Sequence, residues 1–533
     1  SAAVLAAILA VNYGGANISA RADMVSAVEE STKLPEISAA VKETGSAMYA
    51  DAADAADAAE DTVYTIRHAS EGFSVNGGAL TDTNVTTLTE AVKKILDQSE
   101  TKKVAIHFAN IDSSESDGIQ LDTPCELTLT GSYKAEGKSG ALFNIKSPGC
   151  FTIHNTADIT ISYYQAIINS KGTEVIFEHN GGTLTHSAGD TLFNLKTNDK
   201  VYLKGGTING TAFGGSSKEG GGYVEISDGV WNGSLSSVKE VKMIGGRLEN
   251  CKAGENSIYA IRGAEKISIS GSEIYAENTN TNTTDSNRAA YAISMADKTQ
   301  LTLSGNVDIS ASCDSKKQGS IYYSTSGSYP TVDATGLTLV NPGFTLAPYY
   351  AAMTSSSALT NWMECSVDNI DSLLNNMSLN VICPTPETQA ECEKYELKAA
   401  GNYIRIVDKN APASLIEKGV IKKADIQQST EEGKYDVTVT YASAGEGTEE
   451  NPEKNYQYDI TSGSVSGILN DILLMNTGTA GPQITIGSTD KAISEDITID
   501  TAGFSEENAV VLEGEIKGRV TVTGKGTLKS SLS

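Results

Sequence analysis

Two apolar residues separated by one polar residue, then a glycine turn and a further apolar residue, form a pattern that recurs through the middle of the chain. It reads VYLKGGTI from Val201, VEISDGVW from Val224 and VKMIGGRL from Val241. The alternation is typical of strands with one buried side, and glycine tolerates the positive φ of a sharp corner. Successive copies start 23 and 17 residues apart, which is too short for a domain. The pattern therefore describes a repeating structural unit.

A third short apolar segment lies between these copies, reading LFNL at 192–195, IYAI at 258–261 and AYAI at 290–293. Three short strands in each period of about 17 to 34 residues predict a parallel β-helix, in which each turn stacks on the previous one. A β-sandwich with hairpin turns is the alternative. In the β-helix, inward side chains form columns, for which we expect Val201, Leu203, Val224, Ile226, Val241, Met243, Ile267 and Ile269.

Length and charge restrict the possible partners. A chain of 533 residues exceeds what one hydrophobic core supports, so we expect more than one domain. Its formal net charge of -27 argues against nucleic acid and against anionic membrane surfaces. None of its seven cysteines forms a CxxC motif, which argues against a zinc ribbon. Cys383 and Cys392 are spaced to allow a local disulfide, and we expect Cys150 and Cys251 to be small buried residues inside strands.

The first residues, SAAVLAAILAV, form an apolar run that is too short to span a bilayer. Two interpretations stay open. The run is a remnant of an export signal, with Ala20 and Ala22 framing a cleavage pattern, or it is a retained segment that binds another subunit. Both place the protein outside the cytoplasm. Residues 1–80 as a whole favour helical or irregular structure.

Two amphipathic segments, LTEAVKKILDQ at 88–98 and VSGILNDILLM at 465–475, share the same spacing of apolar residues. We expect helices that cover the first turn of a β-helix through Leu88, Val92 and Ile95, and through Ile468, Leu469 and Ile472. The apolar triplets after each helix match in order at offsets of 367 to 380 residues, pairing 104–106 with 484–486, 127–129 with 497–499, 142–145 with 509–512 and 151–153 with 520–522. A second β-helix module with its own capping helix is therefore predicted.

These patterns predict a chain of successive parts. They are an N-terminal helical, assembly or export segment at 1–80, a first β-helix module with its capping helix at 81–330, one or two small spacer domains at 347–460, and the start of a second module at 461–533.

Candidate chemical groups are few. His154 and His179 are 25 residues apart, about one turn, and His186 follows, so stacked imidazoles that bind a metal are one interpretation. Independent exposed histidines are the favoured one, because no carboxylate neighbours support a metal site. The outward residues of the strands form a mixed set without an acidic column: Lys204, Glu225, Lys242, Ser268 and Thr302.

Arg247 and Arg262 stand alone within the repeat region. We therefore assign no catalytic, cofactor-binding or metal-binding residue, and we expect neither an enzyme nor a cofactor.

Residues 83–310 and 462–533 resemble the pectate-lyase-like superfamily of right-handed β-helices, in the form found in adhesin-like arrays on bacterial surfaces. The repeat pattern and the capping helices carry the resemblance. It implies a mainly β fold of right-handed parallel β-helix modules with capping helices, an N-terminal helical segment and a small α+β or β spacer. The paired aspartates, Gly-His-Gly and Arg-x-Lys of the polygalacturonase type do not occur in this sequence.

The expected function is that of an exported structural or adhesive surface protein, a stiff β-helix rod that assembles into filaments or a surface layer. The alternative is a polysaccharide-active β-helix enzyme, a lyase or a hydrolase. The expected partners are further copies of the chain and a surface glycan or another cell-surface ligand, with no nucleic acid and no membrane span. The expected location is extracellular or on the cell surface.

Overall fold

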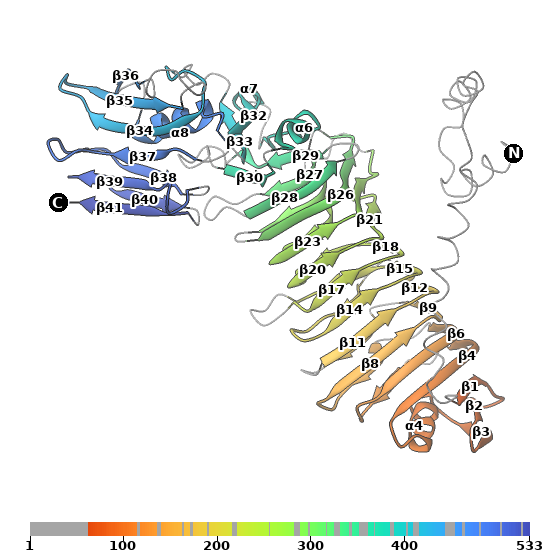
Figure 1. The fold of residues 1–533 in the computed structure, drawn as a ribbon. Coiled ribbons are helices and arrows are strands. Elements are labelled where there is room, and N and C mark those ends of the chain that lie inside the picture. Colours follow the sequence, from red (N-terminus) through yellow and green to blue (C-terminus); the bar gives the residue numbers. More distant parts are fainter. Residues whose placement is uncertain are drawn as a thin grey trace, which may run out of the picture. The chain divides into compact units, whose positions relative to one another are not determined.

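The computed structural model describes most of the chain beyond residue 61 (Figure 1). Contacts divide the chain into two compact units, Ser1–Asp61 and Thr62–Ser533. The described residues are 62–113, 118–135, 140–162, 165–170, 174–188, 191–215, 221–254, 256–281, 288–296, 299–315, 317–323, 331–340, 344–350, 361–366, 368–383, 389–400, 403–408, 415–442, 453–460, 464–478, 481–501, 504–523 and 526–532. The apolar run and the rest of residues 1–61, with the helical segment expected there, lie outside the described residues.

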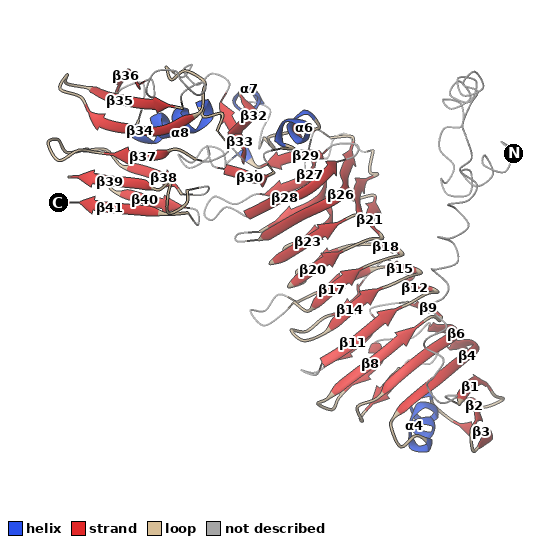
Figure 2. Ribbon diagram, viewed as in Figure 1, coloured by secondary structure: helices blue, strands red, loops and turns tan. Residues whose placement is uncertain are grey.

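A coil of parallel strands forms the largest part of Thr62–Ser533 (Figure 2). Each turn of the coil, which we call a rung, passes through three faces. The first face holds β4 (Lys103–Ser113), β6 (Glu126–Ala135), β8 (Cys150–Asn155), β11 (Glu174–His179), β14 (Lys200–Leu203), β17 (Tyr223–Ile226), β20 (Glu240–Met243), β23 (Lys266–Ser270) and β26 (Gln300–Cys313). The second face holds β9 (Asp158–Ile161), β12 (Thr183–His186), β15 (Thr207–Asn209), β18 (Val230–Asn232), β21 (Arg247–Lys252) and β24 (Glu273–Asn278).

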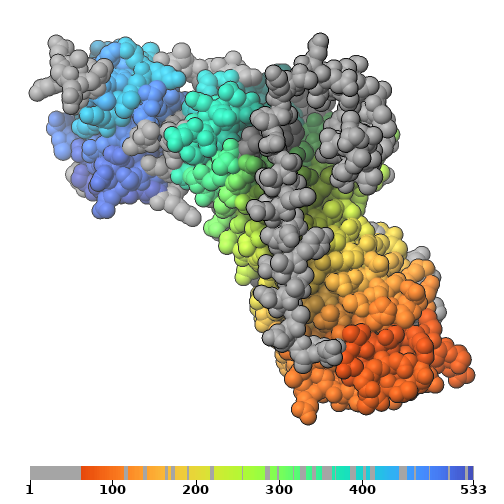
Figure 3. Space-filling model, turned by 45° about the vertical axis from the view of Figure 1, so that its right-hand side comes forward, coloured from red at the N-terminus to blue at the C-terminus, as the bar shows by residue number. Residues whose placement is uncertain are grey.

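The third face is an 11-stranded sheet. It holds β5 (Ile119–Leu121), β7 (Gly140–Ile145), β10 (Gln165–Ser170), β13 (Thr191–Asn194), β16 (Thr211–Phe213), β19 (Leu235–Ser236), β22 (Ser257–Arg262), β25 (Ala289–Met295), β27 (Gln318–Tyr323), β29 (Phe344–Pro348) and β31 (Met377–Leu379). The long strands β6 and β26 run from the first face into the second. Successive rungs follow one another in chain order from orange to green in the space-filling view (Figure 3).

The inward side chains of the first face stack in register. Leu203 lies opposite Ile226, which lies opposite Met243, and Ile269 continues the column. The side chains expected in these columns are at most 1% exposed: Val201, Leu203, Val224, Ile226, Val241, Met243, Ile267 and Ile269. The prediction of a mainly β fold built as a parallel β-helix is therefore confirmed.

Glycines form the corner between the first and second faces. Gly206 has φ +76°, and a Cβ there would lie 2.4 Å from the carbonyl oxygen of Gly182, the corner glycine of the preceding rung. No other residue fits this corner without displacing the backbone. The glycine that recurs in the sequence pattern is thus required by the close approach of successive corners.

The coil begins with a small antiparallel sheet and a helix. The strands are β1 (Val63–His68), β2 (Phe73–Gly77) and β3 (Leu80–Val85), and β1 pairs in parallel with β4. The helix α4 (Leu88–Gln98) follows and buries Leu88, Val92 and Ile95, as expected. The sequence favoured helical or irregular structure up to residue 80, whereas strands occupy most of 63–85. Tyr64, Ile66, Phe73, Val75 and Val85 are the buried residues that hold them in the core.

Beyond β26, two further strands continue the coil on the side of the first face: β28 (Thr331–Val340) and β30 (Asn361–Cys365). An antiparallel pair then ends the sheet: β33 (Tyr403–Asp408) pairs with β30 and with β32 (Tyr395–Ala400). The short helices are α6 (Ile370–Asn375) and α7 (Gln389–Glu393). A disulfide joins Cys383 and Cys392, the pair whose spacing in the sequence allows it.

A second coil has its own hydrophobic core, which extends from Ile416 to Leu512. It begins with the antiparallel strands β34 (Ile421–Gln428), β35 (Lys434–Tyr441) and β36 (Glu453–Asp459) and the helix α8 (Val465–Met475). Its parallel strands are β37 (Gln483–Ile486), β38 (Ile497–Asp500), β39 (Val510–Gly514), β40 (Val520–Thr523) and β41 (Leu528–Leu532). Ile468, Leu469 and Ile472 of α8 are buried in this core, as expected.

The strand pairing corrects the match between the two coils that the sequence suggested. Because β34 pairs with β37 as β1 pairs with β4, the match of 484–486 with 104–106 is confirmed. However, β39, not 497–499, pairs with β37 and so corresponds to β6. By the same criterion β38, β40 and β41 correspond to β5, β7 and β8. Apolar triplets recur several times per rung, so each triplet can be aligned with the wrong neighbour.

The same side-chain hydrogen bond closes both coils. Thr89 in α4 accepts from the backbone N–H of Gln120 in β5 (3.0 Å) and donates to the carbonyl of Gly118 (3.1 Å). Ser466 occupies the equivalent place in α8 and accepts from the backbone N–H of Thr498 in β38 (2.9 Å). Both helices thus cover apolar residues and also supply a hydroxyl to the first strand of a sheet, where an unpaired edge is exposed.

Candidate functional site

Outward side chains on the first face form ion pairs between neighbouring rungs. Glu126 lies opposite Lys103, with its carboxylate 2.7 Å from the ammonium group. The arrangement recurs in Glu174–Lys200 (2.7 Å), Glu178–Lys204 (2.8 Å), Glu225–Lys242 (3.1 Å) and Glu240–Lys266 (2.9 Å). Each pair is partly exposed, so its contribution to stability is at most about 1 kcal/mol. Its main consequence is local charge neutrality on this face.

The outward residues singled out from the sequence lie as expected on this face. Glu225, Lys242, Ser268 and Thr302 are in register with one another, and Lys204 ends its strand beside Glu178. They form no acidic column. Arg247 lies on the second face against Glu249 and Glu273 (2.6 and 3.7 Å), and Arg262 lies on the third face over the ring of Tyr259 (4.9 Å). Within the described residues, no three His, Cys, Asp or Glu side chains are grouped to hold a metal ion.

The three histidines do not share a site. His154 points outward between Glu126 and Glu178, with its ring nitrogens 3.4 and 2.9 Å from the carboxylates. The residue opposite His154 on the next rung is Glu178, and His179 lies opposite Asn155. A difference of one residue moves a side chain to the other side of a strand. The 25-residue spacing therefore separates the imidazoles, because the rung here is 24 residues long.

His179 and His186 are buried, whereas the sequence favoured exposed histidines. The ring of His179 lies 3.1 Å from the side-chain amide of Asn155 and 3.2 Å from the carbonyl of Gly182. Burial lowers the pKa of His179 to about 4, against the smaller opposite effect of its hydrogen bonds. His179 is thus a neutral core residue at physiological pH.

The charges around His154 act on its glutamates. The hydrogen bond from Lys103, followed by its charge, lowers the pKa of Glu126. Burial opposes the same effect at Glu178, but the hydrogen bond and charge of Lys204 lower its pKa overall. Both carboxylates stay ionised and occupied by cations, which suits a structural ion-pair ladder.

The prediction for two cysteines was wrong. Cys150 and Cys251 are exposed, and neither is a buried filler of a strand. Asn250 takes the inward position in β21 and donates to the carbonyl of Tyr259 (2.6 Å), so Cys251 points outward. A polar residue in an inward position breaks the simple apolar alternation and shifts the phase that the sequence suggests.

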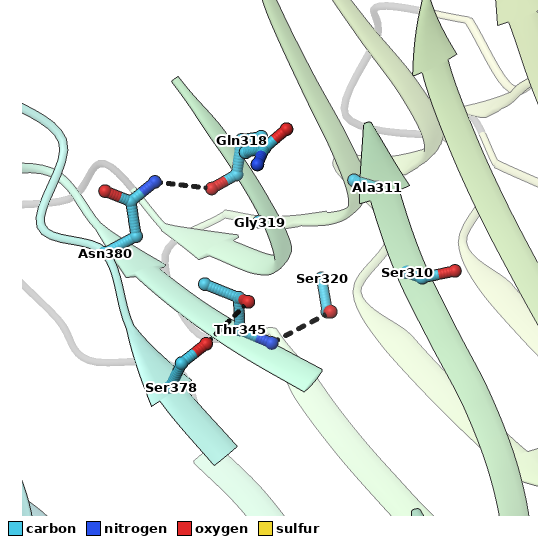
Figure 4. Close-up of a pocket in the computed structure, with 8 residues that line it drawn as sticks. All are labelled: Ser310, Ala311, Gln318, Gly319, Ser320, Thr345, Ser378 and Asn380. Atoms are coloured by element: carbon cyan, nitrogen blue, oxygen red, sulfur yellow. Dashed lines mark hydrogen bonds between the residues drawn. The ribbon is translucent and has the colours of Figure 1, made fainter. Parts of the chain in front are cut away.

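A cavity of about 480 Å³ lies where β26, β27, β29 and β31 approach one another (Figure 4). It was not predicted. Its lining is made of small and neutral polar residues: Ser310, Ala311, Gln318, Gly319, Ser320, Thr345, Ser378 and Asn380. None of these side chains is charged.

Hydrogen bonds fix the wall of the cavity. The backbone N–H of Thr345 donates to the hydroxyl of Ser320 (3.0 Å), and the hydroxyls of Thr345 and Ser378 are 2.8 Å apart. The side-chain amide of Asn380 donates to the carbonyl of Gln318 (2.7 Å). The polar groups thus come from three neighbouring strands and from the residue just after β31, and they are held in fixed positions (Figure 4).

A row of tyrosines lies on the outer side of the same sheet. The ring centroids of Tyr259 and Tyr291 are 5.8 Å apart, and those of Tyr291 and Tyr322 are 4.1 Å apart with nearly parallel rings. Tyr322 follows the cavity residue Ser320 by two positions on β27, so both side chains belong to one side of the strand. Gly319, which lies opposite Tyr291, has no side chain to separate the two rings.

The sequence contains a partial signal for this row. Tyr259 and Tyr291 are both the second residue of the repeated segments IYAI and AYAI, at positions that pair in register. Tyr322 pairs instead with Ser294, so no constant spacing reveals it. The cavity itself depends on residues that are far apart in the sequence, from 310 to 380.

Among the described residues, no helix has the length and apolar character needed to cross a membrane. No protein-family model matches the sequence, and neither a curated protein nor a solved structure matches it significantly. The fold therefore rests on the strand pairing itself, which is that of a mainly β protein with stacked parallel sheets in a β-helix arrangement.

Proposed function

We propose that this chain is an exported structural protein of the cell surface, in which β-helix coils act as stiff spacers that carry ligand-binding faces. The observation that carries the proposal is the repeated start of the two coils. Each begins with three antiparallel strands and a helix that contributes a hydroxyl to the first open strand. Such self-closed units can follow one another along a chain, as in other repeat arrays.

Two further features support this proposal. The disulfide between Cys383 and Cys392 fits an oxidising compartment outside the cytoplasm. The glutamates on the first face are already paired with lysines, so this face does not offer the open carboxylates that bind calcium in lyases of this fold class. The resemblance to adhesin-like arrays agrees with a structural or adhesive function.

Self-association remains part of the proposal. The apolar run at the start of the sequence is the segment expected to contact another copy of the chain. A formal net charge of -27 opposes lateral aggregation at low salt and favours contacts at the ends of such rods.

The test is protease treatment of intact source cells, followed by immunoblotting for this chain. We expect it to be cut while a cytoplasmic marker protein in the same cells stays intact. Purified chain is assayed in parallel for release of reducing ends and unsaturated products from polygalacturonate and alginate, and none is expected. Protection of the chain in intact cells, or product release, would contradict the proposal.

A further inference from the structure

We propose that the cavity between β26 and β31, together with the tyrosine row beside it, binds a neutral oligosaccharide. This inference deepens the proposed adhesive function and rests on it, since it names the class of ligand that such a surface would hold. The site lies on the third face, away from the ion-pair ladder of the first face.

The lining determines the class of ligand. Hydroxyl and amide groups surround the cavity, and no lysine, arginine or carboxylate is among the residues that line it. A carboxylate or phosphate ligand would lose its hydration there without gaining a cation, which is costly. A ligand with many hydroxyl groups and no charge exchanges its hydrogen bonds to water for bonds to such groups.

Several polar groups of the wall are placed to bind such a ligand. The Oε1 atom of Gln318 accepts from the backbone N–H of Cys313 (2.8 Å), which leaves its Nε2 group as a donor. The hydroxyl pair of Thr345 and Ser378 shares one proton between its two oxygens, so one hydroxyl proton remains to be donated. Ser310 adds a hydroxyl from the opposite wall (Figure 4).

The tyrosines supply the apolar part of the site. Sugar rings have C–H faces that pack on aromatic side chains, and tyrosine adds a hydroxyl at its outer end. Ser320 and Tyr322 project from one side of β27 about 6.6 Å apart. That separation suits a ligand that has one sugar unit at the cavity and the next one at the ring.

The size of the cavity agrees with a short oligosaccharide. Its volume of about 480 Å³ is in the range of small-molecule sites. The wall belongs to regular strands, so its hydroxyls are positioned before a ligand arrives and little ordering is needed on binding.

The experiment is isothermal titration of the full chain with neutral oligosaccharides, namely cellohexaose, xylohexaose, mannohexaose and maltohexaose, and with hexagalacturonate as the acidic probe. We expect saturable binding of at least one neutral probe, with a dissociation constant in the range of about 1 mM or below, and none of hexagalacturonate. Failure of all neutral probes to bind, or equal binding of hexagalacturonate, would overturn the inference.

Variants locate the site. Ser378→Trp fills the cavity from its exposed rim, and Ser310→Trp fills it from the opposite wall. Thr302→Trp is the matched control, because Thr302 is an exposed outward residue of the first face. We expect each cavity variant to weaken binding at least tenfold while circular dichroism stays that of the parent chain, and the control to bind normally. Unchanged binding by a folded cavity variant would overturn the assignment.

The result is separable from the test of the proposed function. A chain that is cut on intact cells but binds no neutral probe overturns this inference alone. A chain that binds the sugar but is protected inside the cells overturns the proposed location and leaves the binding site.

Discussion

The hydroxyl that closes the first coil offers a local test of the capping role of α4. Thr89→Val keeps the size and branching of the side chain but removes the acceptor for the N–H of Gln120 and the donor to the carbonyl of Gly118. A buried group left without a partner costs about 1 to 3 kcal/mol, and these partly exposed groups recover some of that from water. We therefore expect a loss of about 1.5 kcal/mol in the local stability of β5.

The assay is hydrogen exchange by mass spectrometry on the peptide that contains Gln120. A loss of that size corresponds to roughly tenfold faster exchange through local opening. Thr89→Ser keeps the hydroxyl and serves as the control. Ser466→Ala in α8 gives the same effect at Thr498 in the second coil. Unchanged exchange at Gln120 in a Thr89→Val chain that keeps α4 folded would refute this account of the cap.

Three further predictions concern stability. Leu203→Asp places an unpaired charge in a fully buried column and costs several kcal/mol in denaturant unfolding, whereas Thr302→Asp on the exposed side has little effect. Because the pKa of His179 is lowered to about 4 and the unfolded state takes up its proton near 6.5, the free energy of unfolding falls by up to about 3 kcal/mol between those pH values; His179→Gln removes this part of the slope. A fragment of residues 415–533 folds cooperatively by circular dichroism, whereas 461–533, which lacks β34 to β36, does not.

Much of the coil can be predicted from the sequence because its constraints are local. Leu203 and its neighbours repeat at two-residue spacing, and the corner at Gly206 admits only glycine. The amphipathic pattern of α4 and α8 likewise gives the helices and their buried residues. Each of these signals lies within a dozen residues.

The remaining features depend on register, which the sequence pattern leaves open. A single residue decides that His154 faces outward and His179 inward, and the inward Asn250 turns Cys251 outward. The cavity combines side chains from rungs that are far apart in the sequence, including Ser310 and Ser378. How the chain divides into independently folding domains stays a prediction, although β34 to β36 pair with the second coil.

The most direct test of the stacked-rung account is a set of distances along one outward column of the first face. Thr152 and Lys266 are separated by five successive pairings in this column, and Gln300 is one pairing further. Pulsed electron resonance on spin labels at 152 and 266, and at 152 and 300, with Cys150 and Cys251 changed to serine, measures these separations. At about 4.8 Å per rung, we expect about 24 Å and about 29 Å. Distances that do not increase by one strand spacing from 266 to 300, or that differ from these values by more than the length of the labels, would contradict the stacked coil.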